Sequence, residues 1–323
     1  MKKLMNDPER IVSSFLDGLV AANGTLIQRL EGTDVIVRRS SPPQKVGLVS
    51  GGGSGHEPAH AGYVGKGMLD AAVAGEVFTS PGADQFFAAI QAADQGEGVL
   101  LLIKNYNGDV MNGEMAQEMA EAEGIKTEMV IINDDVAVND PDQRRGIAGT
   151  VLVQKITGAL AETGASLQDA KRIAEKTVSR VRSMSVALTP CTLPAVAQPS
   201  FDLAEDEMEV GIGIHGERGM DRREVASSEK TAQLLLESVL KEIPSAAPLA
   251  LLINGMGSTP LMEQHVFAND VIKQLDRDIQ HTYVGDYMTS LDMAGVSLTL
   301  LAVDDELSSY LQAPVHTVQW TQC

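Results

Sequence analysis

The chain has 323 residues, of which 44% are hydrophobic, so it is long enough for two domains that each bury a core. Its formal net charge of −19 would repel phosphate backbones and anionic lipids. The pairs Arg144-Arg145 and Arg222-Arg223 are too small to form a compensating basic patch, so the sequence excludes a nucleic-acid or membrane-surface role.

The N-terminal sequence MKKLMNDPERIVSSFLDGLV is unlike a signal peptide, because polar residues from Asn6 to Arg10 interrupt any apolar run. No later run of about 20 apolar residues could span a bilayer. With only two cysteines, the chain offers neither a disulfide framework nor a CxxC pair for zinc or redox work. We therefore expect a protein of the reducing cytoplasm.

Three short apolar runs in the first half predict buried strands: KVGLVS (45–50), GVLLLIKN (98–105) and TEMVIIND (127–134). A polar or glycine-rich loop and a longer helical pattern follow each run, which is typical of a parallel α/β sheet. The segment GEMAQEMAEAEG (113–124) predicts a crossover helix that ends at a glycine. Met111, Met115 and Met119 recur at helical spacing, and we interpret them as core packing rather than as a metal or sulfur site.

A long helical stretch is expected from about Pro141 to Val181, followed by the turn-rich segment SVALTPCTLPAVAQPS. We place a domain boundary near Ser185, with a first α/β domain over residues 1–184 and a second over residues 185–323. Further strand patterns after the boundary predict a second sheet with helices between its strands. The fold class expected is α/β, with two domains that are each a parallel or mixed sheet with flanking helices, and with a C-terminal segment able to pack back on the first domain.

The segment SGGGSGHEP (50–58) predicts a loop in which the backbone adopts unusual angles or lets a small polar ligand approach closely. HEPAH (56–60) has the letters of the HExxH zinc-protease signature. However, the glycines oppose a helix before His56, and Pro58 is best placed as the first helical residue, so His56 and His60 would not share a face. The loop completes neither the Walker pattern nor GxGxxG, so we expect no nucleotide cradle there.

Polar side chains follow three predicted strands at the point where each strand ends. KVGLVS leads to His56, GVLLLI leads to Lys104 and Asp109, and EVGIGI leads to His215 in IHGERG. Because the carboxyl ends of parallel strands meet at one edge of a sheet, His56, Lys104 and Asp109 could converge there. Each also has a simpler interpretation: Asp109 as a turn residue in NGDV, Lys104 on the surface, and His215 as a hydrogen-bonded structural histidine.

Four long motifs resemble the dihydroxyacetone kinase family: SGGGSGHEPAHAGYVGKGMLDAAVAGEVFTSP, IKNYNGDVMN, GIGIHGERG and YVGDYMTSLDMAGVSLTLL. The resemblance is to the substrate-binding subunit of the bacterial phosphoenolpyruvate-dependent, phosphotransferase-system kinases, and it runs from about Met5 to Gln319. It implies that His215 bonds covalently to the carbonyl of dihydroxyacetone as a hemiaminal. An imidazole with an ordinary pKa near 6.5 is largely neutral at pH 7 and can attack a carbonyl carbon.

The same resemblance implies the roles of the other candidates. His56 would be an acid/base residue that hydrogen-bonds the substrate oxygen, and Gly53, Ser54 and Gly55 would line the substrate pocket through backbone groups. Asp109 would accept the proton of the attacking hydroxyl, the usual general-base role in phosphoryl transfer to an alcohol. Lys104 would bind substrate and stabilise developing negative charge.

The sequence shows no motif for holding a nucleotide or a metal ion, so this chain is expected to bind no cofactor and no metal itself. The resemblance implies that ADP or ATP with magnesium sits on a separate L-type subunit, which a phosphotransferase M-type subunit recharges, and that this chain forms a homodimer. Two alternatives stay open. One is a non-catalytic dihydroxyacetone sensor that co-activates a transcription regulator, and the other is a kinase subunit for another short sugar such as erythrulose or glyceraldehyde.

Overall fold

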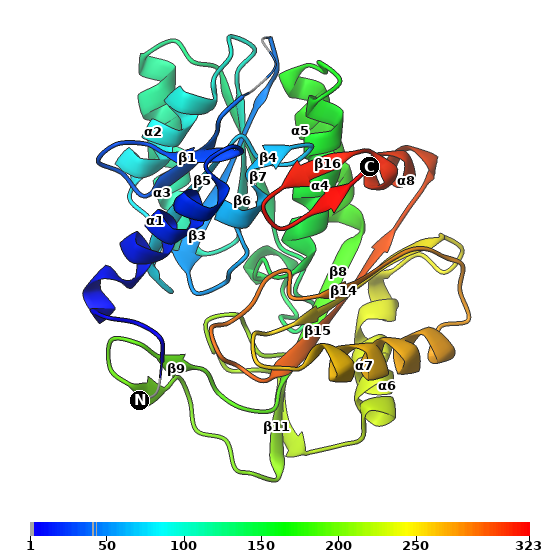
Figure 1. Cartoon of the computed structure of the whole chain (residues 1–323). Helices are drawn as coiled ribbons and strands as arrows, with labels where there is room; N and C mark the ends of the chain where they lie inside the picture. Colours follow the sequence, from blue (N-terminus) through cyan, green and yellow to red (C-terminus); the bar gives the residue numbers. More distant parts are fainter. Residues whose placement is uncertain (1–2, 41, 43) are drawn as a thin grey trace. The chain divides into compact units, whose positions relative to one another are not determined.

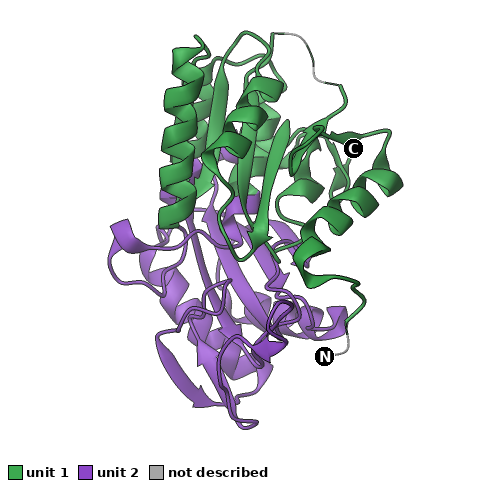
Figure 2. Cartoon of the chain, turned by 90° about the vertical axis from the view of Figure 1, so that its left-hand side faces the viewer, with its two compact units in different colours: residues 1–132, 152–176, 309–323 green, residues 133–151, 177–308 purple. Residues whose placement is uncertain are grey.

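The structure is a computed structural model that describes residues 3–40, 42 and 44–323, and it divides into two compact units, drawn together in Figure 1 and coloured separately in Figure 2. The first unit comprises residues 1–132, 152–176 and 309–323, and the second comprises residues 133–151 and 177–308. Each unit has a sheet with flanking helices, so the expected α/β class with two domains is confirmed. The bounds differ from a single division near Ser185, because that position lies inside strand β8 (Val181–Ala187) of the second sheet.

A six-stranded mixed sheet forms the centre of the first unit. Across the sheet its strands are β1 (Ile27–Arg29), β2 (Val35–Arg38), β5 (Ala71–Val77), β3 (Gly47–Ser54), β6 (Val99–Lys104) and β7 (Thr127–Ile132). The strands β5, β3, β6 and β7 run parallel, whereas β1 and β2 pair antiparallel at one edge. β3 and β6 are buried along their whole length, as their unbroken apolar or glycine-rich sequences predict.

Helices α2 (Ala83–Ala93) and α3 (Asn107–Ala122) pack against this sheet and against each other, as Figure 1 shows. α3 begins six residues before the helix predicted from the sequence, so Asp109 lies in its first turn and not in a loop. The prediction that the methionines of this helix pack in the core is wrong, because Met111, Met115 and Met119 are 56%, 49% and 37% exposed. The helix buries a stripe of small residues instead, consisting of Gly113, Ala116 and Ala120.

The first unit is completed by helix α1 (Ile11–Asn23) and by a small sheet of strands β17 (Thr321–Gln322), β16 (Val315–Thr317) and β4 (Gly65–Lys66). β16 pairs with β4 antiparallel, so the C-terminal segment joins the first unit. Three of the four unit bounds fall within helices α4 (Gly149–Ala161), α5 (Leu167–Arg180) and α8 (Asp305–Gln312), and the fourth follows the end of β7. The helical stretch expected from Pro141 to Val181 is therefore two helices, separated by a turn in which Gly164 has φ +79°.

A second mixed sheet forms the centre of the second unit. Its strands are β12 (Asp221–Glu224), β11 (Glu207–Val210), β8, β15 (Gly295–Ala302), β13 (Leu249–Gly255) and β14 (Ile279–Gly285). All pairs are antiparallel except β13 with β14. Helices α6 (Ser228–Val239) and α7 (Leu261–Gln274) pack against each other and against this sheet, and strands β9 (Thr192–Leu193) and β10 (Gln198–Pro199) form a separate pair.

Two local predictions around the glycine run are corrected by the structure. β3 continues through Gly51, Gly52 and Gly53 to Ser54, so most of the predicted loop is strand. Pro58 does not begin a helix, because residues 57–60 form turns that lead to the short 3-10 helix Ala61–Tyr63. The remaining short 3-10 segments are Pro8–Arg10, Pro141–Gln143 and Leu240–Glu242.

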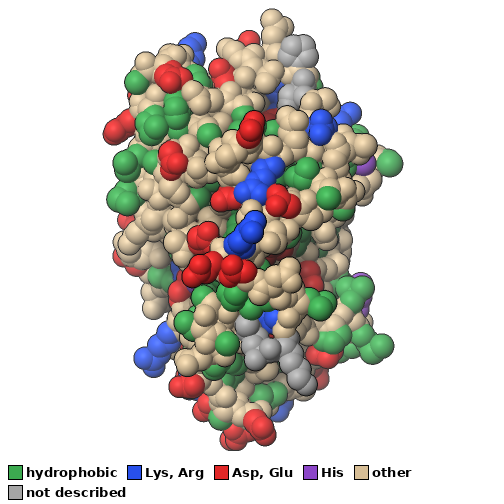
Figure 3. All heavy atoms as spheres, turned by 60° about the vertical axis from the view of Figure 1, so that its left-hand side comes forward, with side chains coloured by type: hydrophobic (Ala, Val, Ile, Leu, Met, Phe, Trp, Pro, Cys, Tyr) green, Lys and Arg blue, Asp and Glu red, His purple; other side chains and the backbone are tan. Residues whose placement is uncertain are grey.

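The surface carries the strong acidic balance of the sequence. On the face drawn in Figure 3, acidic side chains are spread widely and basic side chains lie among them. Within the described part of the chain, no helix combines the length and the apolar character needed to cross a membrane.

Candidate functional site

The ends of β3 and β6 bring the first group of candidate residues to one edge of the first sheet. These neighbouring parallel strands pair in register, with Gly51 opposite Ile103, so Gly52 and Lys104 follow at the same carboxyl edge. Open α/β sheets bind ligands at this edge, because loops and helix N-termini gather there. The structure thus supports the position expected for Lys104 from the sequence.

Asp109 lies in the first turn of α3, which starts two residues earlier at Asn107. Its side chain is 2% exposed, and within the described residues its Oδ1 atom accepts no hydrogen bond. The N-terminal end of a helix carries partial positive charge, which stabilises a buried carboxylate in the first turn. Asp109 is therefore held as a buried acceptor with capacity for a further donor.

Gly52 is the point where these groups meet. A Cβ atom on Gly52 would lie 3.0 Å from Nζ of Lys104 and 3.3 Å from Oδ2 of Asp109, so the ammonium and the carboxylate both reach the same backbone position. Lys104 is fully buried, and its Nζ lies 5.3 Å from the centroid of the Tyr106 ring, a cation–π distance. We call this group, Gly52, Lys104 and Asp109, the Asp109 site.

His56 is fully buried just beyond the end of β3. Its ring stacks on Phe78 with centroids 5.2 Å apart and an interplanar angle of 17°. The neighbouring Gly55 has φ +103° and donates its N–H to the Glu57 carboxylate at 3.0 Å. Burial raises the pKa of Glu57, although the bonds from backbone N–H groups oppose that rise. The imidazole is thus fixed by an aromatic face and by a tight turn.

Gly53 and Ser54 have packing roles that the sequence did not reveal. A Cβ atom on Gly53 would lie 2.6 Å from the backbone nitrogen of Thr79, so no side chain fits there. The Ser54 hydroxyl donates to the carbonyl oxygen of Gly75 at 2.7 Å and joins β3 to β5. Both residues lie at the strand end that was predicted to line a pocket. The backbone of Phe78 and Thr79, just after β5, fills the space beside Gly53, and the Ser54 side chain bonds to β5 itself.

The second histidine of HEPAH has a structural environment. Nδ1 of His60 accepts from the amide nitrogen of Gln154 at 2.9 Å and lies 3.3 Å from the Ser50 hydroxyl. Burial, and then the nearby charge of Lys104, lower the pKa of His60 well below its ordinary value of 6.5. His60 is therefore neutral at pH 7 and belongs to the packing beneath the glycine strand.

His215 lies in the second unit, in the loop of residues 211–219 that follows β11, which we call the His215 loop. Its Nδ1 atom lies 2.9 Å from Oε1 of Glu217, and its backbone N–H donates to Oε2 of the same carboxylate at 2.9 Å. Burial would raise the pKa of Glu217, but the hydrogen bond and charge of His215, together with Arg145, lower it to about 2. Glu217 is consequently ionised at pH 7.

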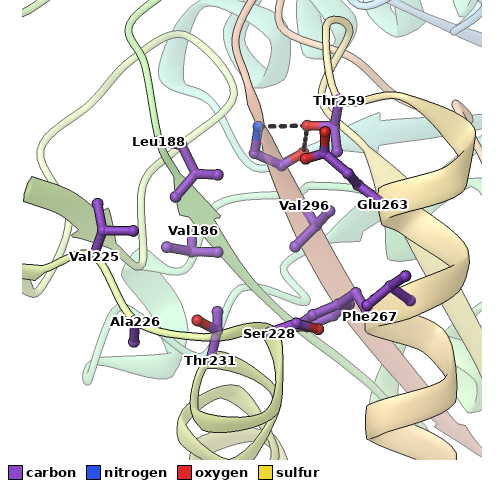
Figure 4. A pocket seen from close by; sticks show the side chains of 12 residues that line it. Val186, Leu188, Val225, Ala226, Ser228, Thr231, Thr259, Glu263, Phe267 and Val296 are labelled. Carbon is purple, nitrogen blue, oxygen red and sulfur yellow. Dashed lines mark hydrogen bonds between the residues drawn. The ribbon is translucent and has the colours of Figure 1, made fainter. Parts of the chain in front are cut away.

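An apolar pocket of about 260 Å³ lies elsewhere in the second unit, between α6 and α7 and over β8 and β15 (Figure 4). Val186, Leu188 and Phe267 are among the side chains that line it, and the Thr259 hydroxyl is bonded to the backbone of Gly295. None of the candidate residues lines this pocket. A three-carbon polyhydroxy ligand has little apolar surface, so such walls offer it few partners.

Sequence reasoning missed Glu217, Phe78 and the particular place of Gly52. Glu217 had a signal, since a carboxylate two residues after a histidine in a glycine-rich loop is able to reach that ring. Phe78 is distant from His56 in the sequence, and only the fold brings the two rings into contact. Gly52 cannot be distinguished from its glycine neighbours without the positions of Lys104 and Asp109.

Comparison with known proteins gives matches over almost the whole chain. A family model described as the Dak1 domain matches residues 17–319. The chain is 53% identical to the PTS-dependent dihydroxyacetone kinase 1, dihydroxyacetone-binding subunit DhaK, of Listeria innocua, over 99% of this chain and 100% of that relative.

Two solved structures are also similar. The dihydroxyacetone kinase from C. freundii in complex with AMP-PNP and Mg2+ is 37% identical with a TM-score of 0.94, over 99% of this chain and 61% of that one. The dihydroxyacetone kinase operon co-activator Dha-DhaQ is 37% identical with a TM-score of 0.90, over 95% of this chain and 98% of that one. The likeness therefore includes both units.

Proposed function

This chain belongs to the Dak1 family, and from that premise we propose that it is the dihydroxyacetone-binding subunit of a dihydroxyacetone kinase. The relative from Listeria innocua carries that function in its name, and the kinase from C. freundii shares the fold of this chain. The observation that carries the proposal is the Asp109 site, where a buried carboxylate and a buried ammonium group meet over a glycine at the ligand-binding edge of an α/β sheet.

We assign His215 the covalent capture of the substrate. Its Nε2 lone pair bonds to C2 of dihydroxyacetone, the π pair of the carbonyl moves to the oxygen, and that oxygen takes up a proton to give a hemiaminal. The Nδ1 proton leaves as the ring returns to neutrality, so no atom of the ligand is lost. Glycerol is of similar size and has hydroxyl groups but no carbonyl, so it cannot form this covalent bond.

Asp109 is proposed as the general base for the terminal hydroxyl of the captured ketose. Its Oδ1 atom is buried and accepts no hydrogen bond within the described part of the chain, which suits an acceptor for a substrate proton. Lys104 would bind the substrate and stabilise negative charge as the oxygen attacks the phosphorus atom. Their common approach to Gly52 supports a joint role.

His56 is proposed as the acid/base residue that hydrogen-bonds the substrate oxygen during hemiaminal formation. Stacking on Phe78 fixes the plane of its ring, as proton transfer at a defined atom requires. The same ligand would contact backbone groups of Gly53, Ser54 and Gly55. Two of these residues have no side chain, and the Ser54 hydroxyl is already bonded to Gly75.

The phosphoryl donor is proposed to be ADP or ATP with magnesium on a separate L-type subunit, recharged through a phosphotransferase M-type subunit, with this chain acting as a homodimer. The name of the Listeria relative, a binding subunit of a PTS-dependent kinase, supports a division of the reaction between subunits. No metal ion or nucleotide is assigned to this chain.

A sensor is the second candidate function, because a co-activator of a dihydroxyacetone kinase operon has the same fold at 37% identity. Ligand capture needs His215, whereas phosphoryl transfer also needs a base such as Asp109. One experiment separates the two functions: the chain is mixed with dihydroxyacetone and a nucleotide-loaded L-type subunit, and dihydroxyacetone phosphate is measured. Product supports the kinase subunit, while ligand capture without product supports the sensor.

A further inference from the structure

The His215 loop is folded on itself by backbone bonds. Gly213 donates its N–H to the carbonyl oxygen of Glu217 at 3.1 Å, and Gly216 donates to the carbonyl oxygen of Gly213 at 3.2 Å. These two bonds turn the chain so that residues 215 and 217 lie together. The pairing of their side chains is therefore a property of the loop itself.

Glu217 holds His215 by two atoms at once. One carboxylate oxygen lies 2.9 Å from Nδ1 of the ring, and the other accepts the backbone N–H of His215 at 2.9 Å. A carboxylate that contacts both ends of one residue restricts the rotation of its side chain. The histidine side chain is only 18% exposed, so competition from solvent for the Nδ1 bond is limited.

The partner of Nδ1 determines which ring nitrogen carries the proton. An ionised carboxylate can only accept hydrogen bonds, so the Nδ1 atom facing Glu217 must be the protonated one. In the neutral ring the lone pair then resides on Nε2, at the opposite side of the imidazole. A carbonyl carbon can be attacked only by a nitrogen with an available lone pair.

Arg145, which packs beside Glu217 over Gly213, forms an ion pair with Asp135. Arg145 donates from Nε to Oδ2 of Asp135 at 2.8 Å and from Nη2 to the carbonyl oxygen of Gly211 at 2.9 Å. The Asp135 side chain is fully buried and that of Arg145 is 12% exposed. A Cβ atom on Gly213 would clash with both the Glu217 carboxylate and the Arg145 guanidinium, so both groups pack over this glycine.

We propose that Glu217 is the positioning residue for His215: it fixes the Nδ1–H tautomer, directs Nε2 away from itself as the nucleophile, and packs with Arg145 over Gly213. This inference rests on the proposed hemiaminal chemistry. It adds a carboxylate–imidazole pair, supported by a buried Asp135–Arg145 ion pair, to a step that otherwise depends on a lone histidine. During attack the ring becomes cationic, and the carboxylate stabilises that charge until the Nδ1 proton leaves.

The first test needs no ligand. Long-range ¹H–¹⁵N correlation spectra of the full chain labelled at histidine, recorded above pH 7, should show His215 as the Nδ1–H tautomer, with assignment from the spectrum of His215→Ala. In Glu217→Gln the amide can donate to Nδ1, so a substantial share of the Nε2–H tautomer should appear. A predominantly Nε2–H tautomer in the wild-type chain would overturn the proposal.

The second test measures capture of dihydroxyacetone by intact mass. Glu217→Gln should form the adduct about 10²-fold more slowly than wild type, and Glu217→Asp, which keeps the charge, should recover part of that loss. Glu237→Gln is the control: Glu237 is a carboxylate of the same unit that lies on helix α6 and accepts a hydrogen bond from Gln233, so its loss should leave capture unchanged.

The outcomes separate two kinds of failure. If Glu217→Gln captures ligand at the wild-type rate, Glu217 does not position the ring. If the wild-type chain shows the Nδ1–H tautomer but captures no ligand at all, the hemiaminal is wrong, whereas the tautomer still establishes that Glu217 sets the protonation of His215.

Discussion

Replacement of Gly52 by alanine adds one methyl group at the centre of the Asp109 site. The new Cβ atom would lie 3.0 Å from Nζ and 3.3 Å from Cε of Lys104, and 3.3 Å from Oδ2 of Asp109. These distances are shorter than ordinary van der Waals contact, so the two buried side chains must move by a few tenths of an ångström. Gly52 also has φ +154°, a conformation that side chains rarely adopt.

The Gly52→Ala substitution is expected to lower both the stability of the protein and its rate of turnover. Backbone strain at such a position costs on the order of 1–3 kcal/mol, which lowers Tm by about 2–4 °C per kcal/mol for a unit of this size. Misplacement of catalytic groups by up to an ångström costs as much as about 10²-fold in rate. We therefore expect Gly52→Ala to lose about 10-fold to 10²-fold in turnover with the partner subunit, beyond any loss of folded protein.

Gly96→Ala is the control that separates strain from contact. Gly96 has φ +90° but no atom within 4 Å of the added Cβ, so it experiences backbone strain alone. Tm by calorimetry and turnover per folded molecule are measured for both variants. Equal turnover in Gly52→Ala and Gly96→Ala would show that Gly52 does not lie against the groups that carry the reaction.

Four further predictions follow from the same structure. Asp109→Asn should still capture dihydroxyacetone, as seen by intact mass, but turnover should fall by about 10²-fold or more because an amide cannot take the hydroxyl proton; wild-type turnover would reduce Asp109 to a packing residue. The chain alone with MgATP should make no dihydroxyacetone phosphate above background in a coupled assay, and robust product after removal of contaminating kinases would reveal a donor site on this chain. The Glu217 carboxyl has a folded-state pKa of about 2, below its ordinary 4.5, so its ionised form contributes stability above pH 4.5 that is lost as the pH falls toward 2. The difference in Tm between wild type and Glu217→Gln should therefore shrink as the pH falls from 4.5 to 2, and a difference that stays constant would contradict the ionised pair. Met115→Gln should change the free energy of unfolding by less than about 0.5 kcal/mol in denaturant titrations, because the side chain is 49% exposed. A decrease in that free energy of more than about 2 kcal/mol would show that Met115 packs in a core.

The parallel strands of the first sheet and the family were predictable because their signals are local. Short apolar runs that alternate with helical patterns predict strands buried on both faces, and β3 and β6 are such strands. The same prediction is wrong for β7, which lies at the edge of the sheet and leaves Ile131 38% exposed. The motifs around His56, Lys104 and Asp109 also place these residues near strand ends. The edge on which Lys104 and Asp109 meet then follows from parallel pairing alone.

Features that depend on distant neighbours were not predictable in the same way. The glycines 51 and 53 resembled a loop, yet side chains there would collide with Val73 in β5 and with Thr79 just after it, so the close approach of this segment requires glycine. The periodic methionines of α3 resembled a core stripe, but Gly113 and Ala116 form the face that packs on the sheet. Two stripes with the same period cannot be ranked without knowing how near the helix lies to its sheet.

The covalent bond between His215 and the ketose is the central claim, and one spectrum tests it most directly. The chain labelled with ¹⁵N at histidine is mixed with dihydroxyacetone labelled with ¹³C at C2, and carbon spectra are recorded for wild type and His215→Ala. The account predicts that bound C2 becomes a tetrahedral carbon with a one-bond coupling to a histidine nitrogen, and that this signal is absent from the variant. Bound ligand whose C2 remains a carbonyl, or a tetrahedral signal that persists in His215→Ala, would contradict it.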